Sequence, residues 1–147
     1  MRSKIAELID TFASMDHEFR LEMLMDYAEK LPPLPERLKT AKQKETHRVH
    51  ECQTPVSLWV EIEDGKVQIY ADVPPESPTV RGFISLLMQA FNGAAPEDLL
   101  SAPSDILQRS GLAQTLGMTR MQGLSAVYRR VKDEVKQAGL SGATRDE

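Results

Sequence analysis

The chain has 147 residues, and its 18 Lys and Arg against 22 Asp and Glu give it a formal charge of −4. Its 41% hydrophobic content and small net charge exclude a mainly disordered chain and predict one globular domain over residues 1–147. The acidity argues against a nucleic-acid partner, and the longest apolar stretch, Phe83–Phe91, is too short to cross a membrane. The single cysteine excludes an internal disulfide, and without an apolar leader we expect a cytoplasmic protein.

Helical spacing predicts two helices within residues 3–31, capped by Ser3 and Asp16. The apolar side of the second helix is expected to carry Phe19, Met23, Tyr27 and Leu31. Prolines beginning at Pro32 end this helix, because proline lacks a backbone donor and clashes with the preceding turn. The polar residues 36–48 that follow are expected to form a loop.

Apolar and polar residues alternate over 56–62 and again over 67–72, which predicts two strands with one buried face each. The Asp64-Gly65 pair between them readily takes positive φ and is typical of a tight hairpin turn. Residues 47–51 are expected to add a short third strand. We therefore expect a small antiparallel sheet of about three strands.

Several helices are expected after the hairpin. The first begins at Ser77-Pro78, with Ser77 as its cap, and ends at Asn92-Gly93. Pro96 opens a short helix, and Ser104 is the expected cap of another that ends near Gly111.

Thr119 and Gln122 form a capping-box pattern ahead of a last helix over about 120–138. Gly139 is expected to end this helix, so that the domain core spans about 4–138 and residues 140–147 form a flexible tail. Because the strands are grouped together and do not alternate with helices, the order of elements predicts an α+β fold. Its two N-terminal helices and several C-terminal helices would pack around the small sheet.

Cys52 is the strongest candidate for chemistry, because it lies in a polar loop between two expected strands. A cysteine reacts as its thiolate, which neighbouring cations favour and neighbouring carboxylates disfavour. His47, Arg48 and His50 could supply cations, whereas Glu51 acts the other way. An inert, buried thiol fits the pattern equally well.

Other kinds of site receive little support from the sequence. His17, His47 and His50 lack a metal-ligand spacing, and the scattered glycines form no phosphate-binding loop. A Cys–His hydrolase stays open as an alternative, since the two side chains need to be adjacent only in space. A non-catalytic interaction module with an inert Cys52 is the other alternative.

The order of several motifs resembles the SufE family, whose members accept sulfur from cysteine desulfurases in iron–sulfur cluster assembly. The resemblance covers about residues 4–135 and rests on Val49–Val56 around the cysteine, Ala71-Asp72, Val80–Phe83 and Thr119–Leu124. The chain departs from the family at two positions of the cysteine loop. Glu51 stands where many members have glycine, and Thr54 stands where many have serine.

The resemblance implies that Cys52 takes persulfide sulfur from a SufS-like cysteine desulfurase and passes it to a SufBCD-like cluster scaffold. Pyridoxal phosphate would belong to the desulfurase, so we expect this chain to bind no cofactor or metal and to be a sulfur-transfer partner, not an enzyme. A scaffold role for this chain would need several cysteine ligands, and it has one. We expect a monomer or a homodimer.

The resemblance also implies roles for other residues. Family members shelter the cysteine beside the sheet, and a loop movement exposes it to the partner. Asp72 and Arg120 are expected near the partner, while the residues expected to shape the cysteine loop are His50, Glu51 and Gln53. Arg120 would be a cation at a helix N-terminus, which the helix dipole disfavours. This unfavourable placement indicates a functional role for Arg120. Arg81 is expected to be structural or partner-facing.

Overall fold

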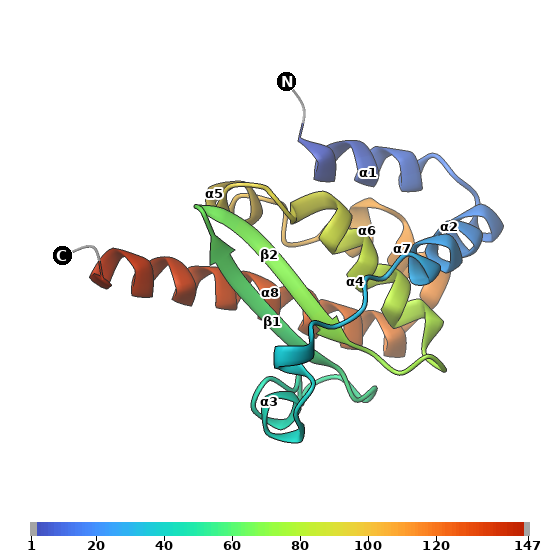
Figure 1. Ribbon diagram of the computed structural model, residues 1–147. Coiled ribbons are helices and arrows are strands. Elements are labelled where there is room, and N and C mark those ends of the chain that lie inside the picture. Colours follow the sequence, from blue (N-terminus) through green and yellow to red (C-terminus); the bar gives the residue numbers. More distant parts are fainter. Residues whose placement is uncertain (1–2, 146–147) are drawn as a thin grey trace.

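The computed structural model describes the backbone of residues 3–145 and the side chains of residues 3–138. Figure 1 shows the elements in chain order. They are α1 (Lys4–Ala13), α2 (His17–Glu29), the 3-10 turn η1 (Glu36–Leu38), α3 (Ala41–Thr46), β1 (Ser57–Glu63), β2 (Lys66–Asp72), α4 (Pro78–Phe91), α5 (Pro96–Leu100), α6 (Ile106–Arg109), α7 (Leu112–Leu116) and α8 (Met118–Arg145).

The structure confirms the α+β fold, but its sheet has two strands within the described residues and not about three. Strands β1 and β2 form an antiparallel hairpin in which Ser57 faces Asp72. Asp64 and Gly65 both have positive φ, 54° and 75°, which confirms the predicted tight turn. The expected third strand is reduced to an isolated bridge between Arg48 and Ser57. It stays short because the chain turns away at once into the cysteine loop.

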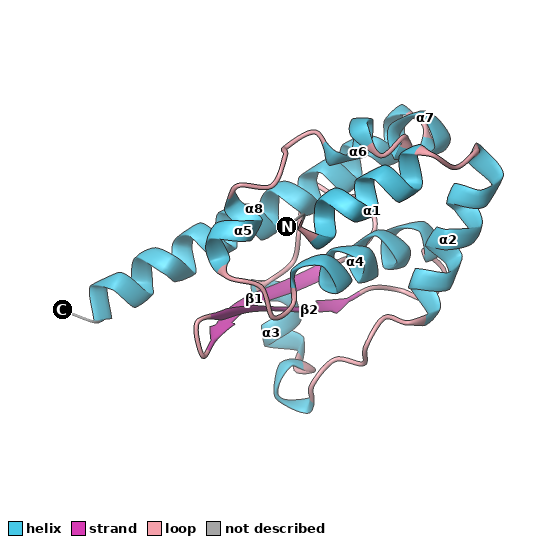
Figure 2. Cartoon of the chain, turned by 90° about the horizontal axis from the view of Figure 1, so that it is seen from above, coloured by secondary structure: helices cyan, strands magenta, loops and turns pink. Residues whose placement is uncertain are grey.

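The two faces of the hairpin are covered by different elements. Figure 2 shows the hairpin as a layer, with most helices on one side and α3 on the other. The prediction that each strand buries one face is wrong for β1, because Trp59 points to the α3 side and is buried as well. Its indole Nε1 donates to Gln43 Oε1 at 3.0 Å, and the His47 ring packs on it. The expectation of a loop over residues 36–48 is wrong, because this segment folds into η1 and α3. Gln43 and His47 of this segment cover Trp59.

Helix α4 forms the centre of the helical side. It is apolar on nearly every face, and its buried residues contact the hairpin, α1, α2 and α8. Gly82 lets α2 approach closely, because a Cβ at this position would overlap the carbonyl oxygen of Leu24. The helix begins after Ser77 and ends before Asn92, as predicted, but the Ser77 side chain makes no capping hydrogen bond.

The two N-terminal helices begin where the sequence predicts. Ser3 Oγ accepts from the Ala6 N–H, and Asp16 accepts from the Phe19 N–H, which confirms both caps. The predicted apolar side of α2 is wrong at Phe19, which is 59% exposed, whereas Met23, Tyr27 and Leu31 are partly buried and pack against the core. The fully buried residues of α2 are Leu24 and Ala28, because α4 packs against that side of the helix.

Arg20 joins the N-terminal helices to α7. Its Nε donates to the Phe12 carbonyl at 2.8 Å and its Nη2 to the Ala13 carbonyl at 3.1 Å. Its Nη1 donates to the Gly111 carbonyl and to Thr115 Oγ1, both at 3.2 Å. The guanidinium therefore satisfies carbonyl groups at the ends of two chain segments that are distant in sequence.

Replacing Arg20 with alanine should lower the free energy of unfolding by about 2–3 kcal/mol, because a charged hydrogen-bond donor is removed from several partners at once. Urea unfolding followed by circular dichroism measures this loss. Arg109→Ala is the matched control, since Arg109 makes an exposed ion pair with Asp105 within one helical turn. That change should cost no more than about 0.5 kcal/mol, and equal losses for the two variants would contradict the bridging role of Arg20.

The C-terminal helices differ from the predicted ones in their boundaries. Ser104 is not a cap, since α6 begins after Asp105, and α7 was not predicted. Helix α8 begins at Met118 after Gly117, so Thr119 lies inside its first turn and the predicted capping box is wrong. Gly139 does not end α8, whose backbone stays helical to Arg145. Of the expected tail, residues 146–147 lie outside the described residues.

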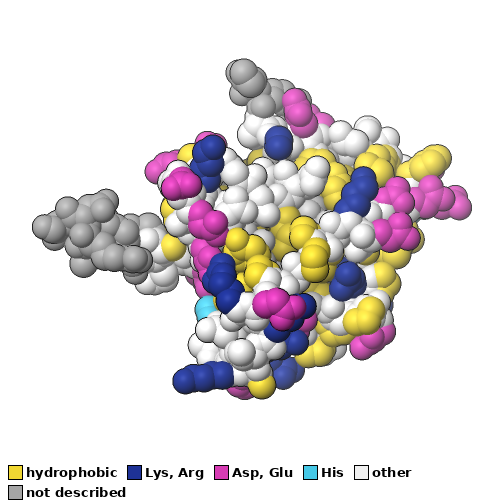
Figure 3. Space-filling view, in the orientation of Figure 1, with side chains coloured by type: hydrophobic (Ala, Val, Ile, Leu, Met, Phe, Trp, Pro, Cys, Tyr) yellow, Lys and Arg dark blue, Asp and Glu magenta, His cyan; other side chains and the backbone are white. Residues whose placement is uncertain are grey.

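The surface mixes charges of both signs. Figure 3 shows Lys and Arg among Asp and Glu on one face, with hydrophobic side chains between them. Within the described part of the chain, no helix has the length and apolar character needed to cross a membrane.

Candidate functional site

Cys52 lies in a loop that hydrogen bonds close at its base. The Val49 N–H donates to the Val56 carbonyl at 2.8 Å, and the Cys52 N–H donates back to the Val49 carbonyl at 3.2 Å. Glu51 and Gln53, on either side of the cysteine, are exposed, whereas Cys52 itself is only 5% exposed. The loop therefore buries its cysteine and leaves the two polar neighbours exposed.

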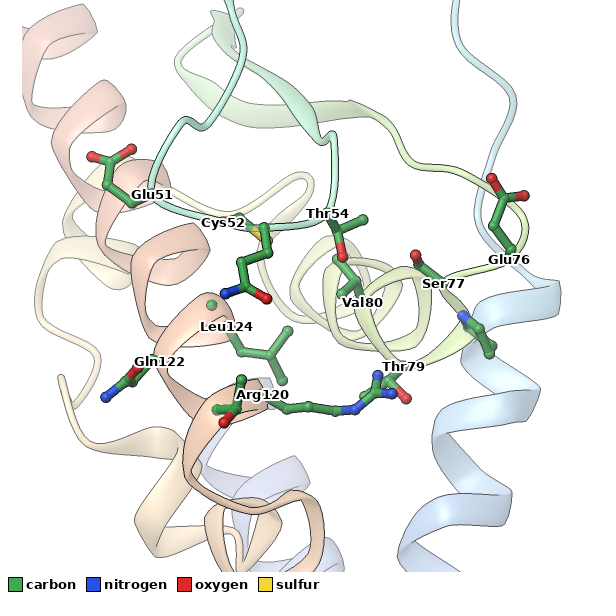
Figure 4. A pocket seen from close by; sticks show the side chains of 14 residues that line it. Glu51, Cys52, Thr54, Glu76, Ser77, Thr79, Val80, Arg120, Gln122 and Leu124 are labelled. Carbon is green, nitrogen blue, oxygen red and sulfur yellow. The ribbon is translucent and has the colours of Figure 1, made fainter.

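The loop covers a hollow of about 390 Å³ that is partly open to solvent. The first turns of α4 and α8 form its other walls, as Figure 4 shows. Its lining residues are Glu51, Cys52, Gln53, Thr54, Glu76, Ser77, Pro78, Thr79, Val80, Thr119, Arg120, Gln122, Gly123 and Leu124. The two helix N-termini carry positive partial charge and Arg120 adds a cation, whereas Glu51 and Glu76 add negative charge to the same lining.

The sulfur of Cys52 lies against α8. A Cβ added at Gly123 would be 3.5 Å from Cys52 Sγ, which is an ordinary contact distance. The apolar side chain of Leu124 is the next residue of this wall. Among the described residues, no hydrogen bond joins Cys52 Sγ to another group, so the thiol is held by packing alone.

Three of the other predicted site residues lie at the hollow, namely Glu51, Gln53 and Arg120. Figure 4 shows that Glu51 points away from the hollow. Arg120 extends across it toward the start of α4, where Thr79 lies. All three side chains are exposed, so they can meet a molecule that approaches Cys52.

The remaining predicted residues do not line the hollow. His50 is exposed on the loop. Asp72 ends β2 and forms an ion pair with Lys44 at 3.5 Å on the α3 side of the hairpin. Arg81 has a structural contact, because its Nη1 donates to the Val73 carbonyl at 2.9 Å. His47 packs on Trp59 and does not line the hollow.

Among the described residues, the arrangement shows neither a hydrogen-bonded Cys–His pair nor a cluster of metal ligands. Nucleophilic catalysis by a cysteine needs a histidine within hydrogen-bond reach, and no hydrogen bond in the described structure joins Cys52 to one. Over the same residues, no group of three or more His, Cys, Asp or Glu side chains could hold a metal ion.

A second set of contacts ties the base of the loop to α8. Arg130 Nη1 donates to the Arg48 carbonyl at 3.3 Å, and its Nε pairs with Glu134 at 3.1 Å. Burial raises the pKa of Glu134, although the neighbouring Arg130 acts in the opposite direction. Sequence reasoning missed Arg130, Glu134 and Gly123 as neighbours of the loop. Only Gly123 had a usable signal, since a glycine inside a helix often marks a close approach.

A small α+β protein with one sheltered cysteine under a loop matches a known class of domain. The family model described as "SufE: Fe-S metabolism associated domain" matches residues 6–135, and the chain belongs to this family. Membership connects the chain with iron–sulfur metabolism.

Its relatives cover most of the chain. An uncharacterized SufE-like protein of Mycobacterium tuberculosis is 33% identical over 91% of this chain and 92% of its own length. A similarly described protein of Synechocystis is 29% identical over 87% of this chain and 77% of its own. The solution structure of a hypothetical protein from Thermus thermophilus has a TM-score of 0.79 and 36% identity, covering 92% of this chain and 95% of that one.

Proposed function

We propose that this protein accepts persulfide sulfur on Cys52 from a cysteine desulfurase and carries it to the site of iron–sulfur cluster assembly. The observation that carries the proposal is the position of the chain's one cysteine, inward-facing beneath a loop at a hollow framed by two helix N-termini. Membership of the SufE family supports it. Within the described residues Cys52 has no hydrogen-bonded histidine, which disfavours the hydrolase alternative.

The transfer is a thiol–disulfide exchange. The Cys52 thiolate attacks the outer sulfur of a persulfide on the desulfurase, and a new S–S bond forms on Cys52 as the old one breaks. The electron pair of the broken bond leaves with the partner's cysteine as a thiolate, so no external oxidant or reductant is needed. The rate depends on access to the attacking sulfur and on its thiolate fraction. A lone cysteine suits a carrier, because a second nearby thiol would displace the sulfur by forming a disulfide.

Access requires a movement of the loop, because Cys52 is buried. At the loop tip the sulfur of Cys52 lies beside Gly123 of α8, whereas the base of the loop is held by the Val49–Val56 hydrogen bond and by Arg130. We propose that the tip swings away from Gly123 while the base stays attached. Closure afterwards would protect the reactive sulfur from oxidation.

The proposed partners follow from this chemistry. The donor is a pyridoxal-phosphate enzyme of the SufS type, and this chain supplies no cofactor. The receiver is a cluster scaffold of the SufBCD type. Glu51, Gln53 and Arg120 surround the opening of the hollow and are the side chains that we propose contact the donor, with Asp72 and His50 further out. Free thiol chemistry needs a reducing compartment, so we propose the cytoplasm.

The test is the rate at which a purified cysteine desulfurase converts cysteine to alanine, with and without this chain. We expect the chain to raise the rate in a saturable way, because it removes sulfur from the enzyme's own cysteine. Measured without desulfurase, an ester or amide substrate should show no turnover. An unchanged rate with a desulfurase from the same organism would contradict the proposal and would favour the interaction-module alternative.

A further inference from the structure

Gly123 has no conformational reason to be glycine. It lies inside α8, five residues after the helix begins, and its φ is not positive. Glycine destabilises a helix interior relative to alanine, because it loses more backbone freedom on folding. Something other than backbone geometry must therefore account for the absence of a side chain.

The space beside Gly123 belongs to the sulfur of Cys52. A Cβ at this position would meet one described atom within 4 Å, Cys52 Sγ at 3.5 Å. That distance is an ordinary contact, so an alanine would fit beside the free thiol without displacing it. Gly82 provides the contrast, since a Cβ there would overlap the backbone of α2. The glycine at 123 thus leaves more room than the thiol alone requires.

A persulfide whose outer sulfur lies on the α8 side of Cys52 needs this additional room. Its outer sulfur is bonded about 2.05 Å from Sγ and needs non-bonded distances of about 3.5–4 Å from carbon atoms. A methyl group already in contact with Sγ would occupy the space on that side. We propose that Gly123 is the residue that allows the loop to close over a loaded Cys52, with the outer sulfur held beside the glycine. This inference rests on the proposed function and deepens it.

Gly123→Ala should affect the free thiol and the persulfide of Cys52 differently. The closed loop would still hold the thiol, but a persulfide would keep the tip open. Gly123 is a positioning residue in this account, because it acts through the space it leaves and not by reacting.

The experiment uses inorganic polysulfide to load sulfur onto Cys52 without a desulfurase. The wild-type chain and Gly123→Ala are loaded, and the loss of the outer sulfur to dithiothreitol is followed by intact-protein mass spectrometry. We expect the persulfide of Gly123→Ala to be lost roughly tenfold faster, the effect of overpacking one methyl group in a filled site. The free thiols of the two chains should be alkylated at equal rates, which a general loosening of the structure would not allow.

Ser125→Ala is the matched control, because it changes a small residue on the same helix outside the hollow. Its persulfide should last as long as that of the wild type. Equal lifetimes for wild type and Gly123→Ala would overturn the proposal. It would also fail if the folded wild-type chain took no sulfur from polysulfide while the chain unfolded in urea did. Neither result depends on a desulfurase, so they are distinct from a failure of the proposed function.

Discussion

Substituting Cys52 should abolish sulfur uptake and leave the fold in place. In both Cys52→Ser and Cys52→Ala, the stimulation of the desulfurase should fall to the rate of the enzyme alone, because no other thiol exists in the chain. The fold should survive, since Cys52 Sγ makes no hydrogen bond within the described structure and loses only packing contacts. Initial rates of alanine formation and far-UV circular dichroism measure the two effects.

The two Cys52 variants serve as controls for each other. Serine places a hydroxyl in a buried site and is expected to cost about 1–3 kcal/mol if that hydroxyl finds no partner. Alanine avoids this penalty and leaves only a small space. If a folded Cys52→Ala chain still stimulated the desulfurase during repeated turnover, sulfur acceptance on Cys52 would be excluded, and the chain would act through binding alone.

Gly82→Ala should cause a large loss of stability. The added Cβ would overlap the carbonyl oxygen of Leu24, and this is a backbone atom that cannot rotate away. Helices α2 and α4 would have to separate along their contact, so we expect a loss of about 2–3 kcal/mol despite the better helix propensity of alanine. For a domain of this size, the loss corresponds to a fall of roughly 5–10 °C in Tm.

Two substitutions on helical positions check this explanation. Gln89→Ala lies on the exposed side of α4 and should change Tm little. Gly123→Ala makes the same chemical change as Gly82→Ala, but its Cβ meets only the Cys52 sulfur at contact distance, so it should be neutral or stabilising. A Gly82→Ala chain as stable as the Gln89→Ala chain would contradict the close approach of α2 and α4.

Local signals in the sequence predicted local structure well. Asp64-Gly65 fixed the hairpin turn because few other residue pairs adopt positive φ so readily. Ser3 and Asp16 predicted helix starts because their side chains satisfy free backbone N–H groups. The wrong predictions concerned burial that depends on tertiary contacts. Phe19 follows the apolar repeat of its helix yet is exposed, because α4 packs on the side of α2 that carries Leu24.

The cysteine loop and Arg120 of the candidate site could be predicted from the sequence, but the packing that forms the other walls could not. Cys52 stood out as the chain's one thiol in a polar loop, and Arg120 as a cation at the start of a helix. The meeting of this loop with Thr79 and Gly123 depends on how α4 and α8 pack, which no local pattern encodes. Trp59 illustrates the same limit, because its burial depends on a segment whose polar composition indicated a loop.

Sulfur acceptance on Cys52 is tested by intact-protein mass spectrometry after incubation with a cysteine desulfurase and free cysteine. We expect a gain of one sulfur atom that a reductant removes, that peptide mapping assigns to Cys52 and that the Cys52→Ala chain lacks. An unchanged mass, with the desulfurase shown to be active in the same mixture, would contradict sulfur acceptance on Cys52.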